Sequence, residues 1–357
     1  MKTARQNSRT AFQNAVIKIN EKNEKKNLEI ENQIALLFDE NNNNKNSMFI
    51  SARKDLNIMR VYYGRYMNSI ISHDNQTKLI TDNRVVNYCT NEKFSTTSHK
   101  LYSLNTKFFS SKIQTDSFLK EFGCVPEHYE RLKKYDNNKL WFCKPNFGSC
   151  GNNIIISNNP ININNQKFVI QESIEPYLIK NCKWDMRMYV FFCIYKDKLY
   201  TYLYRDGFAK LAPEEYNSTN INKRSMLTNT SKLTPKDEKH IDNIQFSIKK
   251  LDSYNSIIDN MERLLSKIQD KMQLYINKIP NNKFILETHL MGFDVIVDKN
   301  NKLYILDVNT QPHTINKHNS TEIKNMKLNL YKDIYDVIKS FYINNDYAHD
   351  NFIKIKN

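Results

Sequence analysis

The sequence predicts a fold of the mixed α/β (α+β) class, and three observations support this prediction. From Lys183 to Tyr195, apolar residues first alternate with charged ones and then run unbroken, which is typical of a strand that becomes buried on both faces. A pair of strands is predicted at Phe293–Val297 and Leu303–Val308, joined by the turn Asp298–Asn301. Apolar residues recur at steps of three and four from Ile258 to Met272, so an amphipathic helix that packs on the sheet is expected there.

Composition and charge limit the classes of protein that the chain can belong to. With 357 residues, 40% of them hydrophobic and 12% aromatic, the chain is expected to form two or three globular subdomains. The formal charge of +15 favours an acidic partner, such as nucleic acid, an anionic membrane surface or an acidic polypeptide tail. No apolar run approaches the roughly 20 residues that cross a bilayer, and the N-terminus lacks the apolar core of a secretory signal. The six cysteines form no CxxC pair, so free thiols and a location inside the cell are expected, with no zinc site.

The chain divides into five predicted segments. The first is basic and only partly ordered, with one helical stretch at about 11–38, and the second alternates short apolar runs with polar turns, as a small α/β domain would. The two long segments that follow contain the motifs described below. The segments are the extension 1–47, the N-terminal domain 48–84, the central domain 85–171, the C-terminal domain 172–343 and the tail 344–357.

A lysine and a glycine-containing loop follow the first apolar strand of the central domain. The strand Leu140–Cys143 leads into Lys144 and then into a loop with Gly148, Ser149 and Gly151. An ammonium group and the backbone amides of small residues suit phosphate oxygens. The same loop would serve equally well as a plain connection between two strands. Taken alone, the loop therefore leaves both interpretations open.

Three charged side chains share one face of the next predicted strand. Lys183, Asp185 and Arg187 alternate with apolar residues, and burying three charges on one face is costly unless they bind ligands or pair with one another. A ligand-binding wall and a structural ion-pair ladder fit this pattern equally well. The partner run Leu199–Tyr204 predicts a hairpin, and a turn is expected at Asp206-Gly207.

Two carboxylates and an amide lie near the ends of the strand pair in the C-terminal domain. Asp307 and Asn309 are two residues apart, so both side chains point the same way from an extended backbone, and Asp294 lies on the neighbouring strand. Carboxylate and amide oxygens suit Mg²⁺, which takes oxygen ligands and keeps substrate phosphates in its shell. A magnesium site is preferred here over an ordinary turn.

Together these motifs resemble the tubulin-tyrosine-ligase family, a branch of the ATP-grasp amino-acid ligases, over most of the chain from about Val85 through the C-terminal helix. The family carries a hinge glutamine, then a K-F-D-x-R strand, then Y-L-Y-R-x-G-F. The corresponding blocks here are KPNFGSCG at 144–151, Gln171, KWDMR at 183–187, YLYRDGF at 202–208, LTN at 227–229 and GFDVIVDKNNKLYILDVNTQP at 292–312.

The resemblance implies an ATP-grasp fold that holds the nucleotide between the central and C-terminal domains, with ATP and Mg²⁺ as cofactors. Guanidinium groups bind carboxylates bidentately, and the family's two arginines face the reacting carboxylate and the incoming amino acid. The implied ATP-binding residues are Lys100, Lys144, Gly148, Ser149, Gly151, Gln171, Glu172, Ile174, Lys183 and Asp185. The implied metal ligands are Asp294, Asp307 and Asn309, the catalytic residues are Lys183, Arg187 and Arg205, and the amino-acid-binding residues are Arg205, Thr228 and Asn229.

Four positions depart from the family pattern. Cys150 stands where family members usually have a basic residue, and Asn153 stands where they have a second glycine, although asparagine tolerates a left-handed backbone. Met226 replaces a common histidine, and Asp307 is one methylene shorter than the usual glutamate. These changes motivate a rival hypothesis, in which the chain is a catalytically impaired member that binds tubulin or nucleotide without ligating.

The implied activity is that of an ATP-dependent, ADP-forming ligase, which activates a carboxylate of an acidic tubulin tail as an acyl phosphate and joins an amino acid to it. Glutamate is preferred, as in a tubulin polyglutamylase, while EEYNSTN at 214–220 resembles the tyrosine-adding enzyme and glycine is a third donor. The expected protein is a cytoplasmic, microtubule-associated monomer without a membrane partner. A nucleic-acid binder is the other alternative, but the pI of about 9.3 comes without a recognisable nucleic-acid-binding signature.

Overall fold

The computed structural model describes residues 49–50, 85–86, 104–130, 136, 138–148, 151–160, 168–195, 197–218, 222–229, 233–278, 286–310, 312, 319–343 and 349–356. Nearly all of the predicted extension and N-terminal domain, with the helical stretch at 11–38, lies outside these residues. The described residues form a mixed α/β fold around two antiparallel sheets, which confirms the predicted class. A short parallel pair, β1 (Phe49–Ile50) with β2 (Val85–Val86), is separate from both sheets.

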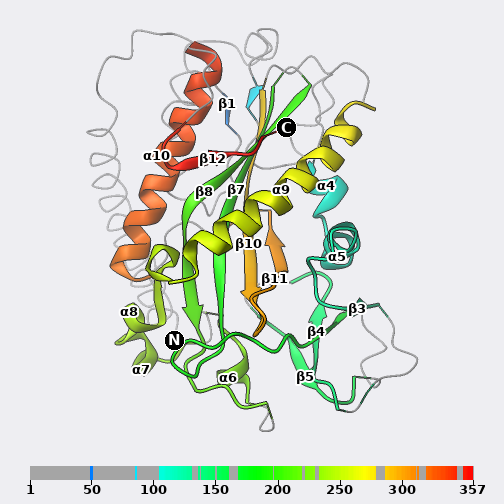
Figure 1. Ribbon diagram of the computed structural model, residues 1–357, viewed down its shortest axis with the longest axis vertical. Helices are drawn as coiled ribbons and strands as arrows, with labels where there is room; N and C mark the ends of the chain where they lie inside the picture. The colour runs from blue at the N-terminus through cyan, green and yellow to red at the C-terminus, as the bar shows by residue number, and fades with distance from the viewer. Residues whose placement is uncertain are drawn as a thin grey trace, which may run out of the picture.

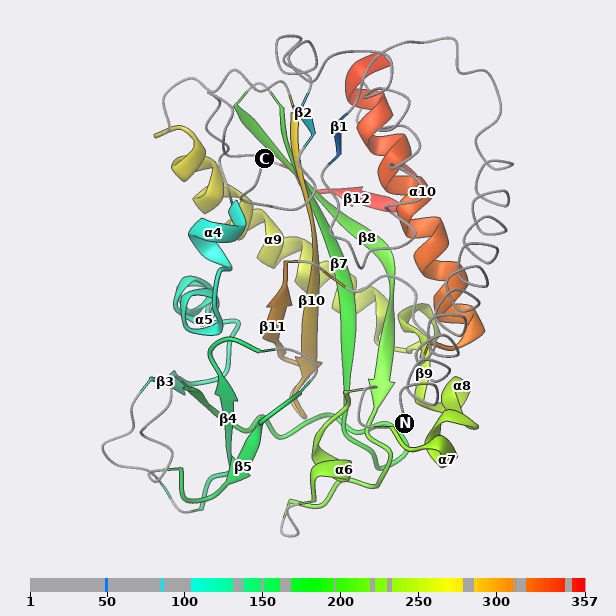
Figure 2. The same ribbon diagram turned by 180° about the vertical axis from the view of Figure 1, so that it is seen from behind.

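The larger sheet forms the centre of the molecule (Figures 1 and 2). Neighbouring strands in it are antiparallel throughout, as predicted for the hairpin and for the strand pair of the C-terminal domain. Its strand order is β11 (Leu303–Asn309), β10 (Leu286–Val297), β7 (Trp184–Tyr195), β8 (Lys198–Leu211) and β12 (Phe352–Lys354), with β9 (Gln245–Ser247) also paired to β8.

The expected turn at Asp206-Gly207 is wrong, because β8 continues through it to Leu211. Leu203 of β8 pairs with Val190, but the next recorded pair is Gly207 with Met188, so three residues of β8 bulge out opposite Tyr189. A Cβ atom on Gly207 would lie 2.4 Å from the carbonyl oxygen of Arg187. The glycine therefore permits close approach of the two backbones, and it does not mark the end of a strand.

Helices cover both faces of the larger sheet. Helix α9 (Tyr254–Ile276) crosses one face, and its apolar stripe from Ile258 to Met272 is buried, as the sequence predicts. The stripe packs on the β7 side chains that alternate with the charged ones, together with α4 (Leu104–Phe108) and α5 (Lys112–Lys120). Helix α10 (Thr321–Ile343) lies along the flank of the sheet near β8 and β9. The short helices are α6 (Lys223–Met226), α7 (Pro235–Glu238), α8 (Ile241–Ile244) and η4 (Ile248–Lys250).

The smaller sheet lies beside one end of the larger one in both views. Its four strands are antiparallel where they pair, and the chain leaves it after β6 to enter the larger sheet at β7. Residues 173–183 make this crossing, and the predicted hinge glutamine, Gln171, lies at the end of β6 directly before it. The strand order is β3 (His128–Tyr129), β6 (Phe168–Glu172), β4 (Trp141–Pro145) and β5 (Ile155–Ser157).

The cysteines of the described residues are free thiols, as expected. Burial raises the pKa of Cys124 to about 12 and that of Cys143 to about 11, so both thiols are protonated at neutral pH. Among the described residues, no helix combines the length and the apolar character needed to cross a membrane.

Candidate active site

A cleft of about 830 Å³ lies between the two sheets, with α5 and α10 contributing to its walls. Its lining contains both charged motifs that the sequence singles out. The basic lining residues are Lys112, Lys144, Lys183, Arg187, Lys210 and Lys327, and the acidic ones are Glu172, Asp185, Asp294 and Asp307. Six basic side chains against four acidic ones leave the cleft positive when all are ionised. Such a site favours a polyanion.

Lys144 lies where the two sheets meet. Its Nζ donates to the side-chain oxygen of Gln171 at 2.5 Å and to the backbone oxygen of Leu306, on β11 of the larger sheet, at 3.1 Å. The amide nitrogen of Gln171 donates in turn to Asp116 on α5 at 2.5 Å. Burial lowers the pKa of Lys144, and burial raises that of Asp116. Gln171 is therefore a buried link between a helix carboxylate and the lysine, a contact that the sequence does not reveal.

Lys112, the first residue of α5, bridges the loop after β4 and the strand β11. Its Nζ donates to the backbone oxygen of Gly148 at 3.1 Å and to the Asp307 carboxylate at 3.0 Å. Asn146 of the loop also contacts this end of the helix, because its side-chain oxygen accepts a hydrogen bond from the backbone N–H of Ile113 at 2.9 Å. This ammonium therefore ties the glycine loop to one of the predicted metal ligands.

The glycine loop packs against the LTN segment. Gly151 has φ +66°, and a Cβ atom there would lie 2.4 Å from the side-chain oxygen of Asn229. Asn153 has φ +57°, which is the left-handed backbone that asparagine tolerates in place of glycine. Ser149 and Cys150 lie outside the described residues, as does Lys100. Gly148, Gly151 and Asn229 line the cleft together.

The three charges of the KWDMR motif all line the cleft, while Trp184, between the first two, lies in the apolar core. Lys183 is 6% exposed, lies 4.4 Å from the centre of the Phe142 ring, and has its pKa lowered to about 8, chiefly by burial. Asp185 pairs with Lys210 of β8 at 2.7 Å and accepts a hydrogen bond from the hydroxyl of Thr228. The motif thus pairs across strands, and no ladder runs along β7 itself.

Asp294 is the centre of the most highly connected charge network in the cleft. Arg187 binds it bidentately, with Nε and Nη2 at 2.8 and 2.9 Å from the two oxygens. Lys210 Nζ donates to it at 3.0 Å, and the Asn309 amide donates at 3.1 Å. Burial raises the pKa of Asp294, but Arg187 and Lys210 together lower it below the ordinary value. Asp294 therefore stays ionised inside the protein.

The predicted metal ligands form one patch. Asp294 of β10 and Asp307 of β11 are directly paired in register, and Asn309 lies two residues beyond Asp307 with its amide at Asp294. Their oxygens are the hard donors that Mg²⁺ takes, so the residues present fit that ion. Protein cations hold both carboxylates in this structure, Arg187 and Lys210 at Asp294 and Lys112 at Asp307.

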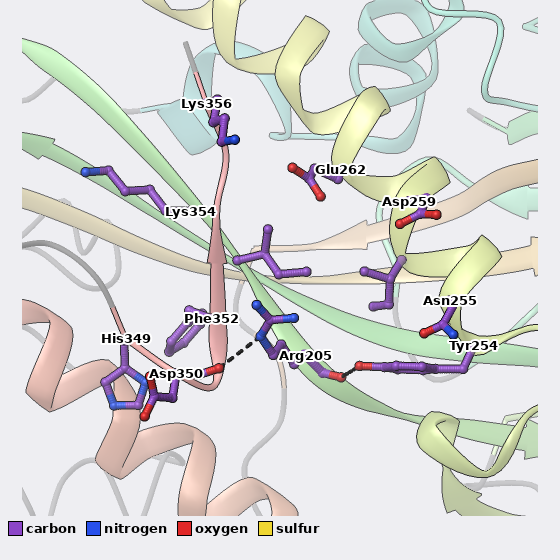
Figure 3. A pocket seen from close by; sticks show the side chains of 12 residues that line it. Arg205, Tyr254, Asn255, Asp259, Glu262, His349, Asp350, Phe352, Lys354 and Lys356 are labelled. Atoms are coloured by element: carbon purple, nitrogen blue, oxygen red, sulfur yellow. Dashed lines mark hydrogen bonds between the residues drawn. The ribbon is translucent and has the colours of Figure 1, made fainter.

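Among the predicted site residues that the structure describes, Arg205 is the one that lies elsewhere. It lies in the bulge of β8 and lines a separate cavity between β12 and α9 (Figure 3). Its Nε donates to the backbone oxygen of Asp350 at 2.9 Å, and its own carbonyl accepts from the Tyr254 hydroxyl at 2.6 Å. Leu203 and Ala209, two and four residues from Arg205, lie in the core that α9 covers, so the alternation of β8 already directs Arg205 to that side. Arg205 is not among the residues that line the cleft between the sheets.

The structure thus brings most of the predicted site together and adds four residues that the sequence analysis missed. Lys210 has a sequence signal, since it continues the alternation of β8 past Phe208, but the expected turn at Asp206-Gly207 hid it. The others reach the site only through folding. Predicted residues in the cleft are Lys144, Gly148, Gly151, Gln171, Glu172, Ile174, Lys183, Asp185, Arg187, Thr228, Asn229, Asp294, Asp307 and Asn309; the missed ones are Lys112, Asp116, Lys210 and Lys327.

Comparison with known proteins gives one family. The sequence pattern of the tubulin-tyrosine ligase family matches residues 65–346, beginning upstream of the motifs described above. The match covers most of the chain, the smaller sheet, and every strand of the larger sheet except β12.

Individual relatives carry names of tubulin-modifying enzymes. The chain is 25% identical over 265 residues to "Probable tubulin polyglutamylase ttll-9" of Caenorhabditis elegans, covering 68% of this chain and 63% of that protein. It is 32% identical over 228 residues to the human "Probable tubulin polyglutamylase TTLL2", covering 60% and 38%. It is 23% identical over 246 residues to "Tubulin glycylase 3B" of Drosophila melanogaster, covering 62% and 32%. The chain therefore spans less than two thirds of the length of each of these relatives.

Proposed function

Because the chain belongs to the tubulin-tyrosine ligase family, we propose that it is an ATP-dependent ligase that joins an amino acid, preferably glutamate, to a carboxylate of an acidic tubulin tail. The names of the polyglutamylase relatives support glutamate as the donor. The observation that carries the proposal is the pairing of Asp294 with Asp307 beside a cleft lined by Lys144 and Lys183. Carboxylates for a metal and lysines for phosphates are the parts that phosphoryl transfer needs.

The proposed fold is ATP-grasp, with the nucleotide between the smaller and larger sheets. Lys144 and Lys183 line the cleft from these two sides, and each would bind phosphate oxygens. Gly148 and Gly151 would bring backbone amides to the same phosphates. The segment from Gln171 to Ile174 would hold the base, since Gln171, Glu172 and Ile174 line the cleft where the chain leaves the smaller sheet.

In the first chemical step a carboxylate oxygen of the tubulin tail attacks the γ-phosphorus of ATP. The bond from this phosphorus to the bridging oxygen breaks, and ADP leaves with that electron pair, which gives an acyl phosphate. In the second step the uncharged amine of the donor attacks the acyl carbon, inorganic phosphate leaves, and the new amide loses a proton. Catalysis of this kind rests on positioning and charge neutralisation.

The protein's own groups would hold the reactants. Asp294, Asp307 and Asn309 would bind Mg²⁺, which would supply positive charge to the phosphates of the nucleotide. Asp294 occupies the Nε–Nη2 edge of the Arg187 guanidinium, and the remaining N–H groups of Arg187 would orient a substrate carboxylate. Thr228 and Asn229 line the same cleft and would contact the donor amino acid. The positive charge of the chain would steer an acidic tail towards the cleft.

The test is incorporation of labelled glutamate, glycine or tyrosine into purified tubulin with Mg-ATP, beside an Asp307→Ala variant. Incorporation of glutamate that disappears in the variant would establish the ligase and its donor. Incorporation of glycine or tyrosine instead would keep the ligase and change the donor. If a folded, ATP-binding protein incorporates none of the three, the ligase proposal fails and the impaired or non-tubulin alternative takes its place.

A further inference from the structure

The LTN segment, Leu227–Asn229, forms the part of the cleft wall proposed for the donor amino acid. Thr228 donates a hydrogen bond to Asp185 of β7, and Asn229 packs against Gly151 of the glycine loop. The short helix α6 ends directly before this segment, and Figures 1 and 2 show it between the smaller sheet and α7. The position of α6 therefore determines where the LTN side chains lie in the cleft.

One guanidinium group on α6 joins the chain before the LTN segment to the chain after it. Arg224 Nε donates to a carboxylate oxygen of Glu214 at 2.5 Å. Its Nη1 and Nη2 donate to the two oxygens of Asp237 at 3.1 and 3.0 Å, a bidentate contact that fixes direction as well as distance. Glu214 precedes α6 and Asp237 belongs to α7, so the two ion pairs hold α6 from both sides. We call Glu214, Arg224 and Asp237 the Arg224 lock.

Both carboxylates of the lock are themselves held by further hydrogen bonds. Asp237 accepts from the backbone N–H and the hydroxyl of Thr234, each at 2.7 Å, in the capping box of α7. Glu214 accepts from the side-chain amide of Asn222, and the side chain of Asn222 caps α6 by accepting the backbone N–H of Arg224 at 2.9 Å. Ion pairs that are bidentate and connected in a network contribute more than isolated exposed pairs.

The lock also uses the EEYNSTN run at 214–220, which the proposed chemistry leaves without a role. Glu214 is the first residue of this run. Tyr216, two residues later, packs on the buried apolar cluster that contains Met226 and Leu227. The described part of the run therefore supports α6 and the LTN segment in two ways, by an ion pair and by apolar packing.

We propose that Arg224 is a positioning residue, which holds α6 so that the LTN segment presents Thr228 and Asn229 to the donor amino acid. The inference rests on the proposed ligase function, which assigns the donor to this segment. Arg224 is not among the residues that line the cleft, so it acts on the donor only through the LTN segment. A site that is already held in its binding geometry loses less entropy when the substrate binds. Lys144, on the nucleotide side, is held by contacts outside the lock.

The test compares Arg224→Met, Arg224→Lys, Asp237→Asn and the double variant Arg224→Met with Asp237→Asn. Lys223→Met is the matched control, since Lys223 is the neighbouring residue of α6, is exposed, and lies outside the lock. The first measurement is equilibrium binding of glutamate in the presence of Mg-ADP, and of ATP alone, by titration calorimetry. The second is kcat and the KM for glutamate and for ATP in the incorporation assay. Urea unfolding measures the stability of each variant.

Arg224→Met should weaken glutamate binding and raise the KM for glutamate by about 5-fold or more, while ATP affinity and kcat stay within about 2-fold. Arg224→Lys keeps the charge but not the fork, and Asp237→Asn removes one of the two ion pairs, so both should show smaller losses. The double variant should be no worse than Arg224→Met, because Asp237 acts through Arg224. Lys223→Met should match the wild type.

Unchanged glutamate affinity in a folded Arg224→Met protein overturns the inference even if its stability in urea falls, because the lock then only stabilises the fold. If Arg224→Met does not fold, unchanged glutamate affinity in both Arg224→Lys and Asp237→Asn overturns it in the same way. Equal losses of glutamate and ATP affinity also overturn it. Glutamate binding that depends on Arg224, without incorporation, would keep the positioning role and refute the ligase. A wild type that neither binds nor incorporates glutamate refutes both.

Discussion

Replacing Asp294 with asparagine should cost far more stability than a single ion pair on the surface would. The carboxylate is 16% exposed at its side chain and accepts four hydrogen bonds, two from Arg187 and one each from Lys210 and Asn309. Asparagine keeps the size but loses the charge, so the guanidinium and the ammonium stay buried without their shared anion. Breaking one partner of a buried pair costs about 3 to 5 kcal/mol. We expect the free energy of unfolding to fall by that amount in Asp294→Asn.

The assay is urea unfolding at pH 7 without nucleotide or Mg²⁺, so that any loss of metal binding cannot contribute. The matched control is Glu175→Gln, which removes the ion pair of Glu175 with Lys299, whose side chains are 64% and 58% exposed. Exposed pairs contribute about 0 to 1 kcal/mol. A loss below about 1 kcal/mol in Asp294→Asn, similar to the control, would refute the reasoning that this network is held by its charges.

The difference in the free energy of unfolding between wild type and Asp294→Asn should also depend on pH, and the structure gives the direction of this dependence. Burial opposes ionisation of Asp294, but Arg187 and Lys210 hold its pKa below the ordinary value of 3.8. A carboxyl group with a lowered pKa in the folded state stabilises the protein fully above the pKa of the unfolded chain, and this contribution is lost as the pH falls through the folded-state pKa. The stability gap between wild type and Asp294→Asn should therefore be constant above about pH 5 and narrow in more acidic solution.

Three further predictions concern the nucleotide side of the cleft. Burial lowers the pKa of Lys183 to about 8, so its ammonium loses a proton as the pH rises from 7 to 9, and ATP affinity measured by titration calorimetry should fall over this range. In Lys183→Met the ATP affinity should be low and should not change with pH over the same range. In urea unfolding, Gly151→Ala should lower the free energy of unfolding by at least about 1 kcal/mol more than Gly123→Ala does, because both residues have positive φ but only at Gly151 would the new Cβ atom meet a neighbour, Asn229 at 2.4 Å. Equal losses in the two variants would count against the packing of the loop on the LTN segment. Lys112→Met should weaken ATP binding about 10-fold, because the substitution removes the hydrogen bonds of Lys112 to the Gly148 carbonyl and the Asp307 carboxylate. The control is Lys120→Met at the other end of α5, where the lysine side chain is 54% exposed, and this variant should bind ATP as the wild type does.

Local sequence periodicity predicted the helices and strands in which apolar residues recur at a regular spacing along the whole element. The alternation from Lys183 to Met188 puts charges on one face and apolar residues on the other, and the structure confirms this arrangement. The stripe of α9 and the β10–β11 pair with its turn follow from the same kind of periodicity. The β8 bulge has no such pattern, because a glycine within a strand and a glycine in a turn look alike in sequence.

The sequence by itself determined the fold class, the charge on the cleft-facing side of β7, and the ordered motifs by which the chain resembles its family. Each of these depends on residues that are neighbours along the chain or two positions apart on a strand. Only the tertiary structure decided which charges meet. Lys112 reaches Asp307 across 195 positions, and Arg187 reaches Asp294 across 107. Lys327 reaches the cleft from a helix whose own sequence marks it only as an amphipathic flank. A charged pair is selected by distance in space and by shared burial, and neither quantity is written in the local spacing of residues.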